Sequence, residues 1–111
     1  MTNDVQLLGG CLAVDDGKSN SLRNLSATTN GTLTVGTGGL LSFASFTPGA
    51  NLAARSITID APLTGNILKF NSDISSSKSY FRWKDGDERY PVRQDADGYL
   101  HPVRGGSISI R

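Results

Sequence analysis

The side chains best suited to chemistry in this sequence are carboxylates in two acidic segments near its C-terminal end. The first reads Asp85-Gly86-Asp87-Glu88 and the second Asp95-Ala96-Asp97-Gly98. Alternate carboxylates before a glycine can converge on a calcium ion, but a complete calcium loop continues to a bidentate glutamate, which the second segment lacks. Hairpin turns use the same residue types. We therefore interpret both segments as turns and expect no metal and no other cofactor.

Nucleophilic and hydrolytic catalysis are poorly supported. His101 is the only histidine and Cys11 the only cysteine, too few side chains for a catalytic triad or a zinc site. A hydrolase with paired carboxylates would draw on Asp73 and the segment 85–88, with no histidine beside them. Cys11 lies among apolar residues, which favours a small buried side chain in a strand. We expect a protein that is not an enzyme.

Arginines interleaved with aromatic residues are the third chemical feature. Such residues anchor protein–protein interfaces. Single-stranded nucleic acid uses them too, but acidic residues interrupt the series here and the formal charge is only +1, so we exclude nucleic acid as the partner. The alternative to a docking surface is a solvated hairpin whose charges pair locally. The residues of the predicted docking surface are Arg82, Trp83, Arg89, Tyr90, Arg93 and Arg104, with Leu7 and Leu8 added if the chain begins with an arm.

Strands must position these side chains, because the composition disfavours helices. Gly, Ser, Thr and Asn supply 42 of the 111 residues and Glu occurs once, whereas helix surfaces are normally rich in Glu, Lys, Ala and Gln. Segments such as Thr32–Val35 and Ser56–Ile59 alternate aliphatic and hydroxyl side chains, as strands with one buried face do. The best helical candidate, Asn51–Arg55, is long enough for one turn.

The expected fold is all-β, an antiparallel, jelly-roll-like β-sandwich with little or no helix, because short apolar runs alternate with turn residues. The run Leu40–Phe46 would aggregate as a bare edge, so we expect it in the core or beneath another subunit. Ile108 and Ile110 should also be core. The expected strands are Gln6–Leu8, Cys11–Val14, Thr32–Val35, Leu40–Phe46, Ser56–Ile59, Ile67–Phe70, Ser79–Trp83, Tyr99–Val103 and Ser107–Ile110.

The length of 111 residues predicts a single β domain, 1–111. Residues 1–10 fit a first strand followed by a turn, or alternatively an N-terminal arm. We expect no signal peptide, no membrane span and no membrane partner. No charged residue occurs from Asn24 to Ala54, whereas 78–111 holds seven basic and five acidic residues. The charge-dense part is where we expect a polar partner.

The length of the chain and the distribution of residue types along it resemble those of a known family. The opening Met1–Gly10, the neutral Gly/Thr-rich middle and the ending Gly105–Arg111 resemble the decoration proteins of tailed double-stranded DNA phages, also called cement or staple proteins. Among these, the sequence is most similar to the small staple proteins of the epsilon-fifteen-like short-tailed phages.

This resemblance implies a non-enzymatic virion protein on the outer capsid surface, made in the host cytoplasm. It would have a jelly-roll-like fold, bind neighbouring subunits of the major capsid protein and pair with itself as a homodimer. It would thereby staple the shell against the internal pressure of DNA. The alternative function is a tail-fibre or receptor-binding module for surface carbohydrate, with Trp83, Tyr90 and Tyr99 as aromatic platforms beside Asp95 and Asp97.

Overall fold

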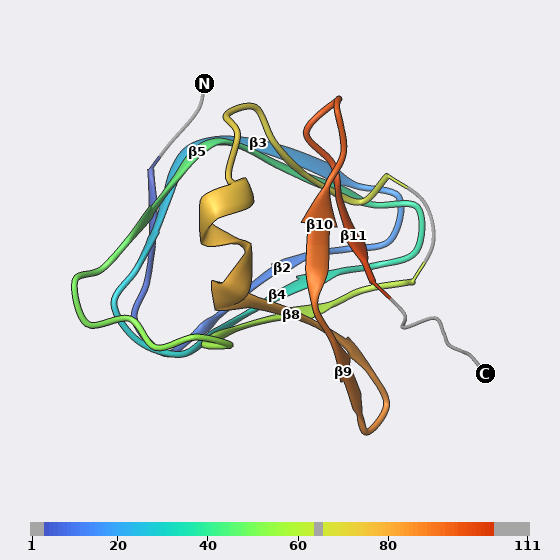
Figure 1. Cartoon of the computed structure of the whole chain (residues 1–111). Helices are drawn as coiled ribbons and strands as arrows, with labels where there is room; N and C mark the ends of the chain where they lie inside the picture. The colour runs from blue at the N-terminus through green and yellow to red at the C-terminus, as the bar shows by residue number, and fades with distance from the viewer. Residues whose placement is uncertain (1–3, 64–65, 104–111) are drawn as a thin grey trace.

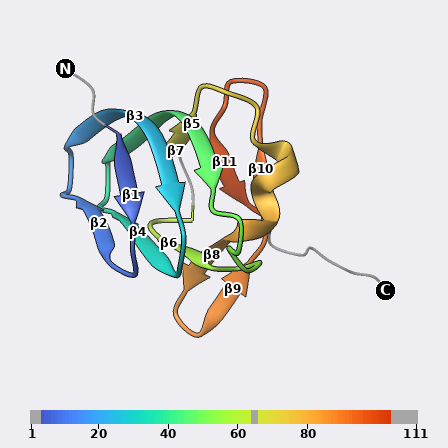
Figure 2. The same ribbon diagram turned by 90° about the vertical axis from the view of Figure 1, so that its left-hand side faces the viewer.

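Successive strands alternate between two sheets in the computed structural model, which describes residues 4–63 and 66–103. Of the first eight strands, the odd-numbered ones form one sheet in the order β1-β3-β5-β7, and the even-numbered ones belong to a second sheet, in the order β2-β4-β6-β8-β9. Neighbouring strands from β1 to β8 are all parallel, so the chain winds as a two-sheeted β-solenoid (Figure 1, Figure 2). Its strands are β1 (Val5–Leu7), β2 (Cys11–Val14), β3 (Ser19–Ala27), β4 (Gly31–Val35), β5 (Leu40–Pro48), β6 (Ile57–Asp60), β7 (Leu68–Phe70) and β8 (Phe81–Asp85).

This architecture confirms the all-β class but corrects the antiparallel, jelly-roll-like sandwich. Among the described residues, helix is limited to the 3-10 segment η1 (Ser75–Tyr80). Alternation of aliphatic and hydroxyl side chains reports which face of a strand is buried, and it looks the same for parallel and antiparallel neighbours. Strand direction depends on the connections. Here each connection crosses to the other sheet before the chain returns, so strands of one sheet run the same way.

The core fills the space between the two sheets. The Phe43 ring stacks on the Phe70 ring with centroids 5.3 Å apart, and the Phe81 centroid lies 5.8 Å from that of Phe70. These rings belong to β5, β7 and β8, so they join both sheets. The run Leu40–Phe46 lies in β5 between β3 and β7, which confirms the expectation that it is not a bare edge.

The turns between the sheets stack on one another. Register pairs such as Leu25 with Phe46 are 21 residues apart, and the same spacing separates two turn glycines with positive φ, Gly17 (69°) and Gly38 (76°). The Asp16 carboxylate accepts the Thr37 N–H at 3.0 Å. A Cβ on Gly36 would collide with that carboxylate, so the close approach of the two turns requires glycine there.

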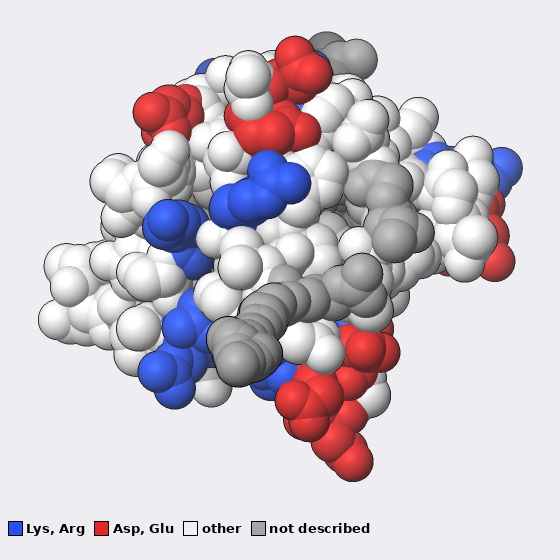
Figure 3. Space-filling model, turned by 45° about the vertical axis from the view of Figure 1, so that its right-hand side comes forward, with Lys and Arg blue, Asp and Glu red and all other residues white. Residues whose placement is uncertain are grey.

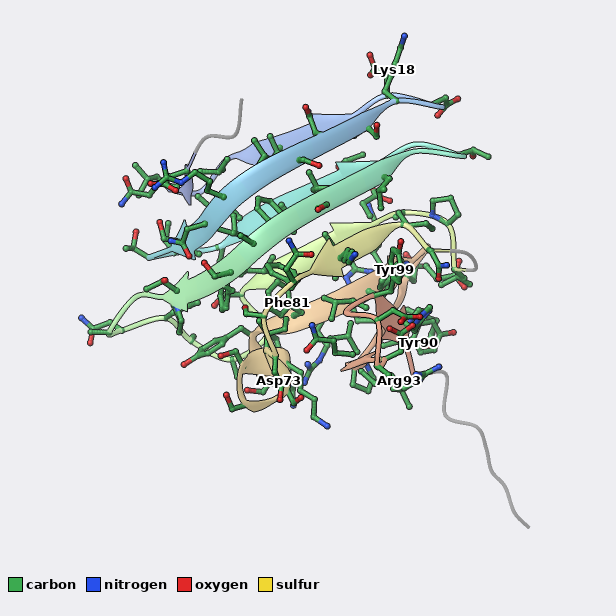
Figure 4. The ribbon with its side chains drawn as sticks, turned by 90° about the horizontal axis from the view of Figure 1, so that it is seen from above. Lys18, Asp73, Phe81, Tyr90, Arg93 and Tyr99 are labelled. Atoms are coloured by element: carbon green, nitrogen blue, oxygen red, sulfur yellow. The ribbon has the colours of Figure 1, made fainter. Side chains whose placement is uncertain are left out.

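The two ends of the solenoid differ. At one end β9 (Glu88–Tyr90) adds antiparallel to β8, and a hairpin of β10 (Val92–Gln94) and β11 (Leu100–Pro102) packs beside β7 and η1. The Gln94 side chain fastens this hairpin, because it donates to the Phe70 carbonyl at 3.0 Å and accepts the Ile74 N–H at 2.8 Å. At the other end, β1 and β2 are the outermost strands and pair with no further described strand. We call the end with β1 and β2 the open end, and the end with β9 and the β10–β11 hairpin the capped end. Figure 4 shows them on opposite sides of the molecule.

The expected and observed strands agree at most positions, with instructive exceptions. β3 was not expected, because Leu22, Leu25 and Ala27 break simple alternation within a polar segment. β9 and β10 were likewise missed. Asn51–Arg55 forms no helix, and Ser107–Ile110, with Ile108 and Ile110, lies outside the described residues.

Candidate functional site

Two residues of the predicted docking surface lie in the core, which corrects their assignment. Trp83 is 1 % exposed, and its indole N–H donates to the Ala61 carbonyl at 3.1 Å. Leu7 is 4 % exposed. Both occupy inward positions of their strands, where alternation directs side chains away from solvent. Neither side chain is accessible to a partner.

The beginning of the chain is a strand where the structure describes it. Val5–Leu7 pairs in parallel with Leu25–Ala27 of the same chain, which favours the first-strand interpretation over an arm. Leu8 follows β1 and is 64 % exposed, so it remains available for contact at the open end. Residues 1–3 lie outside the described residues.

Arg82 and Arg89 come together, with an arginine that the sequence did not single out. Arg82 in β8, Arg89 in β9 and Arg55 in the turn before β6 line one open cavity of about 450 Å³, together with Thr58 and Pro91. Burial and the neighbouring charge of Arg55 both lower the pKa of Arg82, in that order of importance. The charges of Arg55 and Arg82 therefore lie near each other in this cavity.

Tyr90 and Arg93 complete this end of the molecule. Tyr90 ends β9 half-buried, opposite Trp83 across the β8–β9 pair, and Arg93 is exposed on β10. Figure 4 shows both at the capped end. We call Arg55, Arg82, Arg89, Tyr90 and Arg93 the arginine surface. Arg104 lies outside the described residues.

Basic and acidic side chains both gather at this end. In Figure 3, Lys and Arg side chains gather above and beside an acidic tip at the lowest point of the molecule. That tip is the β8–β9 hairpin, which carries Asp85, Asp87 and Glu88. The solvated-hairpin interpretation required local pairing of opposite charges. Among the described residues, the ion pairs join Arg23 with Asp4, Lys84 with Asp60 and His101 with Asp95, so the arginine surface takes part in none of them.

The second acidic segment is a turn, as its residue types indicated. Asp95 Oδ1 accepts the N–H groups of Asp97 and Tyr99 at 2.9 and 3.0 Å, and Oδ2 lies 2.8 Å from His101 Nε2. The hydrogen bond from His101, supported by those two N–H groups, holds the pKa of Asp95 below its usual range. The Asp73 carboxylate is likewise used locally by the Ser75 hydroxyl and N–H, which lower its pKa. Within residues 4–63 and 66–103, no three His, Cys, Asp or Glu side chains are grouped to hold a metal ion.

Two further expectations change with the geometry. Cys11 does lie in a strand, β2, but it is exposed, because Leu12 and Val14 take the inward positions. The aromatic platform of the carbohydrate alternative loses Trp83 to the core, and the Lys69 ammonium lies 5.5 Å from the centroid of the Tyr99 ring.

Arg55 was missed because it lies 27 residues before Arg82, in a turn with no motif. The parallel pairing of β6 with β8 brings the two segments together, with Thr58 opposite Arg82. Recognition of a solenoid repeat would have been the only route to this contact.

No protein-family model, curated protein or solved structure matches the chain. In the part of the chain that the structure describes, no helix is long and apolar enough to cross a membrane.

Proposed function

We propose that this protein is a non-enzymatic structural component of a phage virion, which binds the outer capsid surface and staples neighbouring subunits of the major capsid protein. The observation that carries the proposal is a pair of unlike contact surfaces at opposite ends of one solenoid: the open edges of β1 and β2, and the arginine surface. A protein that staples neighbouring subunits needs two such contact surfaces. The resemblance of the sequence to phage decoration proteins supports the same role.

The open end offers backbone groups to a partner. The Gly10 carbonyl accepts the N–H of Thr32 in β4, and the Val14 carbonyl accepts the N–H of Gly36, the residue that follows β4. Backbone groups alternate sides along a parallel strand, so those of Cys11 and Ala13 face away from β4. An edge of this kind can receive a strand of another protein, and exposed Leu8 adds an apolar contact beside it.

The solenoid between the two contact surfaces is suited to transmit force from one to the other. Continuous parallel ladders run from β2 through β4 and β6 to β8. A pull between the ends is therefore shared among backbone hydrogen bonds and the core of the molecule. Repeated over a shell, many moderate contacts of this kind sum to a large resistance through multivalency.

The test is co-sedimentation of the purified protein with capsid shells of a matching phage prepared without it. We expect saturable binding, and we expect Arg89→Ala with Arg93→Ala to reduce occupancy at least tenfold while the melting temperature holds, since both side chains are exposed. Arg23→Ala with Lys18→Ala, which removes two exposed charges outside the arginine surface, is the control of equal charge change. Full binding of the double variant would remove the arginine surface from the proposal.

A carbohydrate-recognising tail-fibre or receptor-binding module is the second candidate. One observation favours it: an open, polar cavity of about 380 Å³ lined by residues including Asn71, Asp73, Gln94 and Asp97. Absence of binding to a verified matching shell, together with saturable glycan binding, would replace the capsid role with this one.

A further inference from the structure

The arginine cavity has the composition of an anion site. Its lining contains three guanidinium groups, the Thr58 hydroxyl and no carboxylate. Arginine stays protonated at neutral pH, so the lining carries three positive charges in one recess. The ion pairs of the described residues neutralise none of these charges, so an anion in the recess would be attracted by all three.

Two of the guanidinium groups are held in place by the backbone. Arg82 Nη1 donates to the Phe81 carbonyl at 2.7 Å, and Arg89 Nη1 donates to the Gly86 and Glu88 carbonyls at 3.0 Å each. Within the described part of the chain, all hydrogen bonds of these two side chains use Nη1. Their Nε and Nη2 donors are therefore left for a ligand, on groups whose orientation is already restricted.

Arg55 is held in an unusual backbone conformation at the same cavity. Its φ of 64° is the only positive value at a non-glycine residue in the described chain. Its N–H donates to the Ser79 carbonyl at 2.9 Å, which fixes the turn against η1. Glycine or asparagine adopts this conformation more easily, so the fold by itself gives no reason for an arginine here. A role for its side chain does give one.

We propose that this cavity binds a doubly charged tetrahedral oxyanion, a phosphate or sulfate group. Such a group offers at least three acceptor oxygens and a charge near −2, which matches guanidinium donors from three segments that line one cavity. A volume of about 450 Å³ exceeds what one such group fills, so the opening leaves room for whatever the group is attached to. The source of the group is either the free anion or an ester on a larger molecule.

Calorimetric titration in phosphate-free buffer at fixed ionic strength tests the assignment. The probes are inorganic phosphate, sulfate, glucose 6-phosphate and acetate. We expect saturable binding of the first three at one site and weaker binding of acetate. Tighter binding of glucose 6-phosphate than of inorganic phosphate assigns the site to an ester, and the reverse order assigns it to the free anion.

The variants separate loss of the site from loss of the fold. Arg55→Gly removes a guanidinium but accepts the positive φ, so affinity should fall about tenfold while the melting temperature stays the same or rises. Arg82→Gln should weaken binding similarly. Lys18→Gln is the control of equal charge change, because Figure 4 shows Lys18 far from the capped end. The proposal is overturned if no probe binds saturably, if acetate binds as tightly as phosphate, or if Lys18→Gln weakens binding as much as Arg55→Gly.

Discussion

At the scale of single residues, Asp95 ties the turn between β10 and β11 together. One carboxylate oxygen accepts two backbone N–H groups of its own turn, and the other contacts His101. The acidic residue types that resembled part of a calcium loop therefore serve the turn itself. His101, the only histidine of the chain, has a structural partner in the same hairpin.

The depressed pKa of Asp95 makes stability depend on acid. A carboxylate that is more acidic in the folded chain stabilises the fold above the unfolded value, near 3.9, and this contribution disappears as pH falls through the folded value. We expect Asp95→Asn to unfold more easily than the wild type at pH 6 and the gap to close toward pH 2. Urea unfolding across that range measures it. A gap independent of pH would show that the charge of Asp95 contributes nothing.

Gly98 is required where the β10–β11 turn meets β7. Its φ is 98°, and a Cβ would collide with the Phe70 carbonyl oxygen, whereas Gly86 has a φ of 58° and open space around it. We expect Gly98→Ala to lower the free energy of unfolding by about 3 kcal/mol or more and Gly86→Ala by about 1 kcal/mol. Chemical denaturation of both variants gives the comparison. Equal losses would mean that the backbone at Gly98 moves aside.

Sequence patterns identified the type of side chain at the candidate site better than its position. Arg89 and Arg93 are exposed and Arg82 and Tyr90 are half-buried, but Trp83 is core. An isolated tryptophan between Arg82 and Lys84 reads equally well as an exposed anchor or as an inward residue of an alternating strand. Arg55 joins the site through pairing across the solenoid, which no local pattern reports.

At the scale of elements, the edge strand β2 should tolerate a proline that an inner strand does not. The N–H of Ala13 faces the open edge, so Ala13→Pro removes a donor that the fold does not use and blocks strand addition. We expect a change of under about 1 kcal/mol in the free energy of unfolding, together with weaker shell binding. Thr34→Pro in β4 is the contrast and should cost about 3 kcal/mol or more. Undiminished shell binding by Ala13→Pro would exclude the β2 edge as a contact surface.

The strands could be predicted individually, but their neighbours could not. Hydrophobic patterning and flanking turn residues predict strands such as Thr32–Val35 and Leu40–Phe46. The parallel register is only weakly visible in the sequence. A spacing of 21 residues separates Val14 from Val35 and Gly17 from Gly38. The later turns of the solenoid differ in length, since Gly31 pairs with Ile57 at a spacing of 26. A repeat that covers one turn and then drifts is hard to separate from chance in a chain rich in Gly, Ser and Thr.

At the scale of the whole molecule, the solenoid has a direction. One end is closed by β9, η1 and the β10–β11 hairpin, and at the other end β1 and β2 pair with no further strand in the part of the chain that the structure describes. A β-solenoid that exposed both ends would stack on copies of itself without limit, so closing one end limits this growth. The asymmetry assigns different partners, or different sites on one partner, to the two ends.

Thermal disruption of capsid shells is the direct test of the proposed stapling role. Shells of a matching phage, prepared without this protein, would be heated alone and after saturation with the purified protein, and release of the major capsid protein would be followed. We expect a clearly higher disruption temperature for the saturated shells, and a smaller rise with the Arg89→Ala, Arg93→Ala double variant. Saturated shells that come apart at the same temperature as bare ones would contradict the stapling role.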